Sequence, residues 1–147
     1  QTVTLDQLYQ QRILQHNQHP QHFGPLPSAT HRGRGIDALC GDDIEVALVV
    51  EAGRVVEAKF SGEACAVTKA SASMLMTWLI GRPVTEVPMA YGAFQQLLAN
   101  PEAGANELLG ELNDLQPVGA FPARRGNAFL PWQATLEALG LQLSQST

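Results

Sequence analysis

The stretch from Ala64 to Ile80 constrains the fold of this chain more than any other part of the sequence. Its apolar and small residues recur at intervals of three and four, which predicts a helix with one continuous buried face. Gly81 and Pro83 follow directly and mark the C-terminal end of that helix. The expected buried face consists of Val67, Ala70, Ser71, Met74, Leu75, Trp78 and Leu79.

Alternating apolar residues before this helix predict a small antiparallel sheet. Residues Asp43 to Glu51 alternate strongly, and residues Arg54 to Ser61 alternate more loosely. Ala52-Gly53 between them is a tight-turn signal, so the two strands are expected to form a hairpin. Arg34 to Leu39 is a weaker strand candidate because two glycines dilute its pattern. The expected inward residues are Ile44, Val46, Leu48 and Val50 on the first strand of the hairpin and Val56, Ala58 and Phe60 on the second.

Helical spacing also occurs toward both ends of the chain. Leu5 to His16 predicts an amphipathic helix that ends before Pro20, and Pro20 to Ser28 predicts a loop. Further helical segments are expected at residues 91–98, 106–112, 114–118 and 128–139. Because the strands precede most of the helices, the predicted class is α+β, a small three-stranded antiparallel sheet with helices packed on one face. The 147 residues suit one domain spanning residues 1–147.

The charge balance argues against one class of partner. The chain has 14 Asp and Glu residues against 9 Lys and Arg residues, whereas surfaces that bind nucleic acid are normally basic. The pairs Arg32/Arg34 and Arg124/Arg125 are too small to reverse this balance. The longest apolar run, Val46 to Val50, is far shorter than a membrane span. No charged leader followed by an apolar segment opens the chain, which favours a cytoplasmic location.

The two cysteines, Cys40 and Cys65, are the candidates for chemistry. Cys40 lies in the turn after the first expected strand, and Cys65 lies at the start of the strong helix, where the backbone dipole favours a thiolate. In a three-stranded meander these two positions share one edge of the sheet, and Asp42 follows Cys40 closely enough to reach the same ion. Two thiolates and a carboxylate form a partial site for zinc or iron. The alternative is that Cys65 is a buried core thiol and Cys40 a turn residue.

Four stretches resemble the SufU-like branch of the NifU/IscU scaffold family. They are Leu8 to Gly24, with its helix and proline–glycine turn, then Cys40-Gly41-Asp42, then Phe60 to Met74, and finally Phe121 to Trp132. Residues Leu97 to Leu115 are similar to the insertion that separates this branch from shorter scaffold proteins. The resemblance covers nearly the whole chain in order and implies the SufE/NifU-like fold.

The resemblance also implies a function. Cys40 corresponds to the first ligand cysteine and sulfur acceptor, Asp42 to the ligand carboxylate, and Cys65 to the second ligand cysteine. The implied protein is an iron–sulfur cluster assembly scaffold or sulfur-transfer accessory protein rather than an enzyme. It accepts sulfur from a cysteine desulfurase and binds zinc, iron or a nascent Fe–S cluster through Cys40, Asp42 and Cys65.

One position departs from the family pattern. The third ligand cysteine should follow Phe-Pro-Ala-Arg by three residues, and that position is Asn127. An amide oxygen is a poor donor for a soft metal site, so metal binding is expected to be weak. Gly126-Asn127 instead favours an N-cap for the last helix, with Pro131 near its first turn.

Two other functional classes remain open at this point. A degenerate paralogue would hold no metal and act as a binding or regulatory partner of the assembly machinery, which the missing cysteine favours. A hydrolytic zinc enzyme needs a general base beside the metal, and apart from Asp42 the sequence supplies none.

The remaining motifs, one of arginines and one of histidines, each have a structural and a functional interpretation. Arg124 and Arg125 stabilise a thiolate or persulfide, or else they are surface charge. His16, His19 and His22 recur every three residues, but Pro20 interrupts any helix there. A solvated turn that contacts a partner is the preferred interpretation of these histidines, ahead of a metal site.

Overall fold

Three antiparallel strands in the order β1-β2-β3 form the sheet on which the molecule is built. The strands are β1 (His31–Asp37), β2 (Asp42–Glu51) and β3 (Arg54–Glu63), in a computed structural model that describes residues 11–141. The predicted hairpin is confirmed, because β2 pairs with β3 across a turn in which Ala52 and Gly53 both have positive φ. The first strand begins earlier than the range predicted for it and ends before Leu39.

The pairing of β2 with β3 contains one irregularity. Val49 pairs with Glu57 and Val50 with Val55, so Val56 has no partner in the ladder. This bulge moves the alternation of side chains by one residue at the start of β3. Val55 is therefore fully buried and Val56 is 39% exposed. The predicted inward position of Val56 is wrong for that reason.

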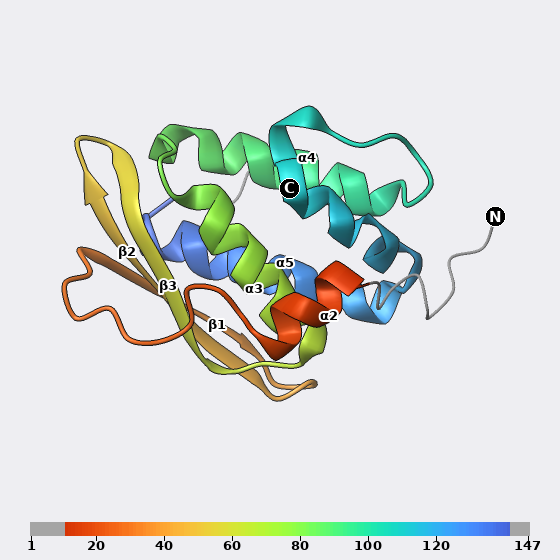
Figure 1. Ribbon diagram of the computed structural model, residues 1–147, viewed down its shortest axis with the longest axis horizontal. Coiled ribbons are helices and arrows are strands. Elements are labelled where there is room, and N and C mark those ends of the chain that lie inside the picture. The colour runs from red at the N-terminus through yellow and green to blue at the C-terminus, as the bar shows by residue number, and fades with distance from the viewer. Residues whose placement is uncertain (1–10, 142–147) are drawn as a thin grey trace.

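Helices cover one face of the sheet, and α3 and α5 lie directly against it (Figure 1). The predicted class, α+β with helices packed on one face, is confirmed. The strong helical stretch is α3, whereas the predicted N-terminal helix lies partly outside the described residues. In the described part of the chain, no helix is long and apolar enough to cross a membrane. The helices are α2 (Gln11–Gln18), α3 (Ala66–Leu79), α4 (Val87–Ala99) and α5 (Pro122–Ala138), with 3-10 segments η1 (Val84–Glu86) and η2 (Glu107–Ala120).

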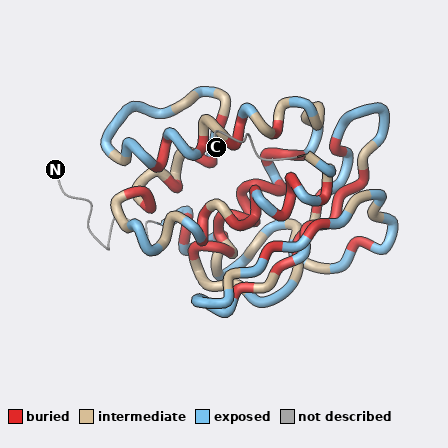
Figure 2. The backbone as a smooth tube through the Cα atoms, turned by 180° about the vertical axis from the view of Figure 1, so that it is seen from behind, coloured by how far each residue is buried: buried red, intermediate tan, exposed pale blue. Residues whose placement is uncertain are grey.

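Helix α3 is the centre of the core, and its backbone is buried along most of its length (Figure 2). It lies between the sheet, α5 and the more N-terminal α2. Because apolar burial is the main stabilising contribution to folding, the residues of α3 that are not apolar are conspicuous. Three hydroxyl residues, Thr68, Ser71 and Ser73, are fully buried there. Each needs a hydrogen-bond partner from another element.

The other face of β2 is covered by a loop instead of a helix. Leu26 packs against Ala47 and Val49, which point away from the helices. This explains why β2 is buried on both faces in its central part, although its neighbours are not. The loop predicted at Pro20 to Ser28 thus contributes a small core of its own.

Strand β1 meets α5 at two glycines. A Cβ atom at Gly33 would lie 2.1 Å from the carbonyl oxygen of Ala134, and one at Gly35 would lie 3.0 Å from the Leu130 side chain. Contacts of 2.1 Å are impossible for a real Cβ, so only glycine permits this approach at position 33. The two glycines that weaken the strand pattern in the sequence are the residues that admit α5 to the sheet.

Candidate functional site

The turn between β1 and β2 presents Cys40 to solvent. The Oδ1 atom of Asp37 accepts hydrogen bonds from the backbone N–H groups of Leu39 (3.0 Å) and Cys40 (3.4 Å). Gly41 then adopts a φ of 75°, a left-handed conformation that suits glycine. Leu39 is 99% exposed and Cys40 is exposed as well. Local hydrogen bonding therefore fixes a turn in which Cys40 is exposed.

Asp42, the first residue of β2, is buried, with 1% of its surface exposed. Its Oδ1 atom accepts the backbone N–H of Cys65 at 2.7 Å. Its Oδ2 atom accepts the Thr68 hydroxyl at 2.5 Å and the Asn127 amide at 3.1 Å. A buried carboxylate is costly unless donors replace its lost hydration, and here three N–H and O–H donors, from α3, from its N-cap and from α5, do so.

Cys65 is the N-cap of α3, at the helix start where the sequence predicted it. Its Sγ atom lies 3.6 Å from Oδ2 of Asp42 and 3.3 Å from the hydroxyl of Thr68. The residue is half-buried, so its thiol is less open to a partner than that of Cys40. The helix N-terminus places partial positive charge near this sulfur.

Asn127 is fully buried in the interior of α5, so the predicted N-cap is wrong. The helix begins at Pro122, with Phe121 as its N-cap. Proline is favoured at the first helical position, and a glycine such as Gly126 costs only about 1 kcal/mol in a helix interior. Pro131 consequently lies inside α5 instead of near its start, and it has no N–H to donate to the carbonyl group of Asn127.

The Asn127 side chain connects the exposed thiol to the buried carboxylate. Because a carboxylate only accepts hydrogen bonds, the amide nitrogen of Asn127 faces Asp42 and its oxygen faces Cys40. The Sγ atom of Cys40 makes a weak contact with that oxygen at 3.9 Å. The structure thus places Cys40, Asp42 and Cys65 at one end of the sheet, but Cys40 reaches Asp42 through Asn127.

A ready-made metal site is not formed by these residues. Among residues 11–141, no three His, Cys, Asp or Glu side chains lie close enough together to hold one ion. Both oxygens of Asp42 already accept hydrogen bonds, and the two cysteines contact different members of the network. A structural zinc ion requires four ligands. The arrangement therefore does not fit a resident zinc ion.

The next carboxylate along the chain has a different environment. Asp43 is partly exposed and receives two hydrogen bonds from the guanidinium of Arg34, across the β1–β2 ladder. This hydrogen bonding, together with the charge of Arg34, holds the pKa of Asp43 below its usual value. Asp42 and Asp43 alternate across the strand, so one faces the helices and the other faces Arg34.

The two arginines near the site differ in their contacts. The Nε atom of Arg125 donates to the carbonyl oxygen of Gly119 at 2.8 Å, which links α5 to η2. Arg124 lies three residues before Asn127, a spacing that places neighbours on one side of a helix. A role for Arg124 beside a thiolate or persulfide stays a prediction.

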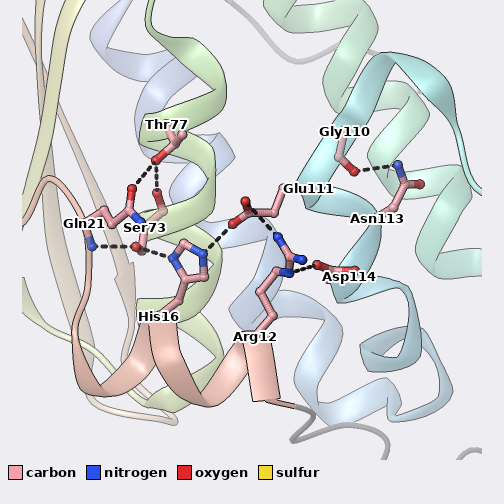
Figure 3. A network of polar contacts seen from close by, with 9 residues as sticks. All are labelled: Arg12, His16, Gln21, Ser73, Thr77, Gly110, Glu111, Asn113 and Asp114. Atoms are coloured by element: carbon pink, nitrogen blue, oxygen red, sulfur yellow. Dashed lines mark hydrogen bonds and ion pairs between the residues drawn. The ribbon is translucent and has the colours of Figure 1, made fainter.

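His16 is 5% exposed, so the predicted solvated turn is wrong for this histidine. Its Nδ1 atom contacts the Ser73 hydroxyl at 2.6 Å and its Nε2 atom contacts Glu111 at 2.5 Å. Glu111 also pairs with Arg12, as Figure 3 shows. The histidine joins α2 to α3 and to η2, and its contacts with Ser73 and Glu111 involve neither cysteine.

Sequence reasoning missed the two side chains that hold the carboxylate. Thr68 lies three residues after Cys65, a spacing that brings it back toward the helix N-terminus. The sequence did contain a signal for Thr68: it is a hydroxyl residue in the first turn of a predicted helix that begins with a cysteine. Asn127 was noticed as a departure, but nothing in the local sequence indicates that it lies across from Asp42.

Comparison with known proteins gives a consistent family. The model of the NifU-like N-terminal domain matches residues 8–127. The zinc-dependent sulfurtransferase SufU of Bacillus subtilis is 32% identical over 132 residues, which cover 90% of this chain and 89% of the relative. The iron–sulfur cluster assembly scaffold protein IscU of Thermotoga maritima is 31% identical over 135 residues, covering 90% of this chain and 92% of that protein.

Solved structures agree in fold. A NifU-like N-terminal protein from Brucella abortus matches with a TM-score of 0.83 at 24% identity, covering 92% of this chain and 94% of that one. A putative scaffold protein for the SUF system from Fervidobacterium islandicum also has a TM-score of 0.83, at 21% identity, covering 92% of this chain and 99% of that one.

Proposed function

The chain belongs to the family of NifU-like N-terminal domains, and from this membership we propose that it is an iron–sulfur cluster assembly protein whose Cys40 accepts sulfur from a cysteine desulfurase. One observation carries the proposal: Cys40 is exposed on a turn that hydrogen bonds hold open, whereas Cys65 is half-buried against Asp42 and Thr68. A sulfur donor on another protein therefore reaches Cys40 more directly than Cys65.

The transfer requires no oxidant or reductant. The thiolate of Cys40 attacks the outer sulfur of a persulfide on the donor cysteine. The bond between the two donor sulfurs breaks as the new S–S bond forms, and the donor leaves as a thiolate. Cys40 then carries the persulfide. In this role the chain is an acceptor and carrier, and the desulfurase performs the cleavage of the carbon–sulfur bond.

Apolar surface beside the thiol supports a protein as the donor. Leu39 is 99% exposed and Ile36 is 57% exposed, one and four residues before Cys40 in the chain. Neighbouring apolar side chains that are exposed to solvent are a feature of protein interaction sites. A small-molecule donor would need no such surface.

Iron or a nascent cluster enters this proposal as cargo. Cys40, Asp42 and Cys65 are the ligands that we propose for it, with the carboxylate exchanging hydrogen bonds for a metal bond. Asp42 must give up the Thr68 and Asn127 contacts to Oδ2, or the Cys65 contact to Oδ1. Binding is therefore expected to be weak and easily reversed.

The test is sulfur transfer from a cysteine desulfurase supplied with cysteine, followed by mass spectrometry of the peptides that contain each cysteine. We expect one added sulfur atom on the Cys40 peptide, lost in Cys40→Ser and retained in Cys65→Ser. Label that depends on Cys65 instead would contradict the proposed acceptor. Stable binding to the desulfurase with no label on either cysteine would favour the alternative, a partner without sulfur chemistry.

A further inference from the structure

Without a cation, hydrogen bonds within the protein satisfy both oxygens of the Asp42 carboxylate. Three N–H or O–H donors reach it, from the backbone of Cys65, the hydroxyl of Thr68 and the amide of Asn127. They come from helices α3 and α5 and from the N-cap of α3, which pack on the sheet. Hydrogen bonds to a charged acceptor are stronger than neutral ones, so this set compensates the carboxylate for its burial.

Two of these donors converge on a single atom. The Oδ2 atom accepts from Thr68 at 2.5 Å and from Asn127 at 3.1 Å, and the Cys65 sulfur lies 3.6 Å away from it. A metal ion bound to Oδ2 and to the sulfur of Cys65 uses the same lone pairs and the same space. Thr68 and Asn127 are therefore direct competitors of such an ion.

The burial of both competitors makes the competition effective. Thr68 and Asn127 are each 0% exposed, so neither side chain turns into solvent to vacate the carboxylate. If an ion withdraws the acceptor, a buried hydroxyl and a buried amide lose their partner, which is costly. In addition, the amide oxygen of Asn127 contacts Cys40, so displacement of Asn127 also disturbs the acceptor thiol.

We propose that Thr68 and Asn127 lock Asp42 into an internal network that replaces a resident zinc ion, so that Cys40 accepts sulfur without bound metal. The proposal rests on the function proposed above and specifies how the same site is held. A metal ion binds only in competition with the two side chains. Thr68 and Asn127 are positioning residues, because they act through Asp42 and not on the transferred sulfur.

The first test is zinc affinity, measured on the anaerobically purified chain by competition with a chelator. Asn127→Ala and Thr68→Val each remove one competing hydrogen bond, and each is expected to bind zinc about tenfold more tightly than the wild type. Asn127→Cys adds a thiolate ligand as well and is expected to give the largest gain. Equal or weaker zinc binding by both Asn127→Ala and Thr68→Val would overturn the proposal.

Two matched variants control for the loss of buried polar groups. Thr68→Ser keeps the hydroxyl and should retain wild-type zinc affinity. Thr135→Ala removes a buried hydroxyl from α5 that donates only to the carbonyl oxygen of Pro131, so zinc affinity should not change. Urea unfolding of each variant establishes that the protein titrated is folded. A gain in Thr135→Ala equal to that in Asn127→Ala would assign the effect to loosening of α5 and contradict the proposal.

The second test separates this inference from the proposed function. Sulfur transfer from the desulfurase to Cys40 is measured in the presence of a zinc chelator and again with added zinc. We expect the same extent of labelling in both. Labelling that requires added zinc would overturn the metal-free mechanism and leave Cys40 as the acceptor. No labelling in either condition would overturn the proposed function, and the zinc titration would still decide whether Thr68 and Asn127 compete with the ion.

Discussion

Two buried polar centres, one around Asp42 and one around His16, contact helix α3, and their hydrogen bonds lead to different parts of the molecule. Asp42 is 1% exposed and is held by Thr68, whereas His16 is 5% exposed and contacts Ser73. From Asp42 the hydrogen bonds lead through Asn127 to an exposed thiol. From His16 they lead to Glu111 and its ion pair, which connect helices to one another (Figure 3).

The comparison shows that burial and complete hydrogen bonding do not by themselves indicate chemistry. Both centres satisfy their polar groups, as a folded interior requires. The Asp42 centre is joined to an exposed thiol, whereas the Ser73 hydroxyl beside His16 is fully buried, so we infer a functional role only for the Asp42 centre. The following variants test that division.

The largest effect on stability is expected for Asp42→Ala. The substitution leaves the Thr68 hydroxyl and the Asn127 amide buried without their acceptor, and it should lower the free energy of unfolding by about 3–5 kcal/mol. Urea unfolding measures this loss. Asp43→Ala is the matched control, because its solvent-screened pair with Arg34 should contribute little to stability. Equal losses in the two variants would remove the distinction between buried and exposed carboxylates.

His16→Ala is expected to lower the free energy of unfolding by about 2–3 kcal/mol, because Ser73 and Glu111 both lose a contact and a buried ring leaves a cavity. The exposed His19 supplies the control variant, His19→Ala, for which little change is expected. Sulfur acceptance per folded molecule should stay at the wild-type level in His16→Ala. A selective loss of labelling at Cys40 would show that the two centres are coupled.

Removing the α3 hydroxyl that contacts each centre, Thr68 or Ser73, is expected to have an intermediate effect on stability. Thr68→Val keeps the shape of the side chain and removes one donor to Asp42, and about 1–2 kcal/mol of stability should be lost. Ser73→Ala, which removes a contact to His16 and to the backbone N–H of Gln21, should cost a similar amount. The two variants should differ only in zinc affinity, which is expected to rise in Thr68→Val and to stay unchanged in Ser73→Ala. A rise in both would contradict a lock confined to Asp42.

The smallest effect concerns His22, which belongs to neither centre. Partial burial, and then the charge of Lys59, lower its pKa in the folded state. The unfolded chain therefore binds this proton at a higher pH than the folded chain does. Stability should be unaffected well above pH 6.5 and should fall slightly as the pH decreases from that value toward the folded pKa.

His22→Asn should remove this pH dependence, and asparagine also tolerates the φ of 61° at this position. Urea unfolding at several pH values between about 5 and 8 measures the slope for both proteins. An unchanged slope in His22→Asn would assign the pH dependence to other groups.

The sequence predicts the framework of this molecule better than its polar contacts. The helix α3 and the β2–β3 hairpin follow from periodicity, which is a local property of consecutive residues. The contacts of His16 join residues 57 and 95 positions apart, and no local pattern encodes such pairs. Histidine spacing therefore suggested a solvated turn where the fold makes a buried bridge.

The same limit applies to the candidate site. The order of the strands placed Cys40, Asp42 and Cys65 at one end of the sheet, and their proposed roles came from the family resemblance. The place of Asn127 was misjudged because Gly126 before it suggested a helix start, whereas Pro122 begins the helix. The contact of Asn127 with Asp42 spans 85 positions and depends on how α5 packs.

The close approach of β1 and α5 at Gly33 has a consequence for how the site tolerates change. Asn127 lies about two turns before Ala134, whose carbonyl oxygen leaves no room for a side chain at position 33. In a saturation library, substitutions at Gly33 should be depleted because they push α5 away from the sheet. Position 127 should accept several residues, including cysteine, while the backbone stays in place. Evolution can thus change the side chain at position 127, whereas the close approach of β1 and α5 at Gly33 must be kept.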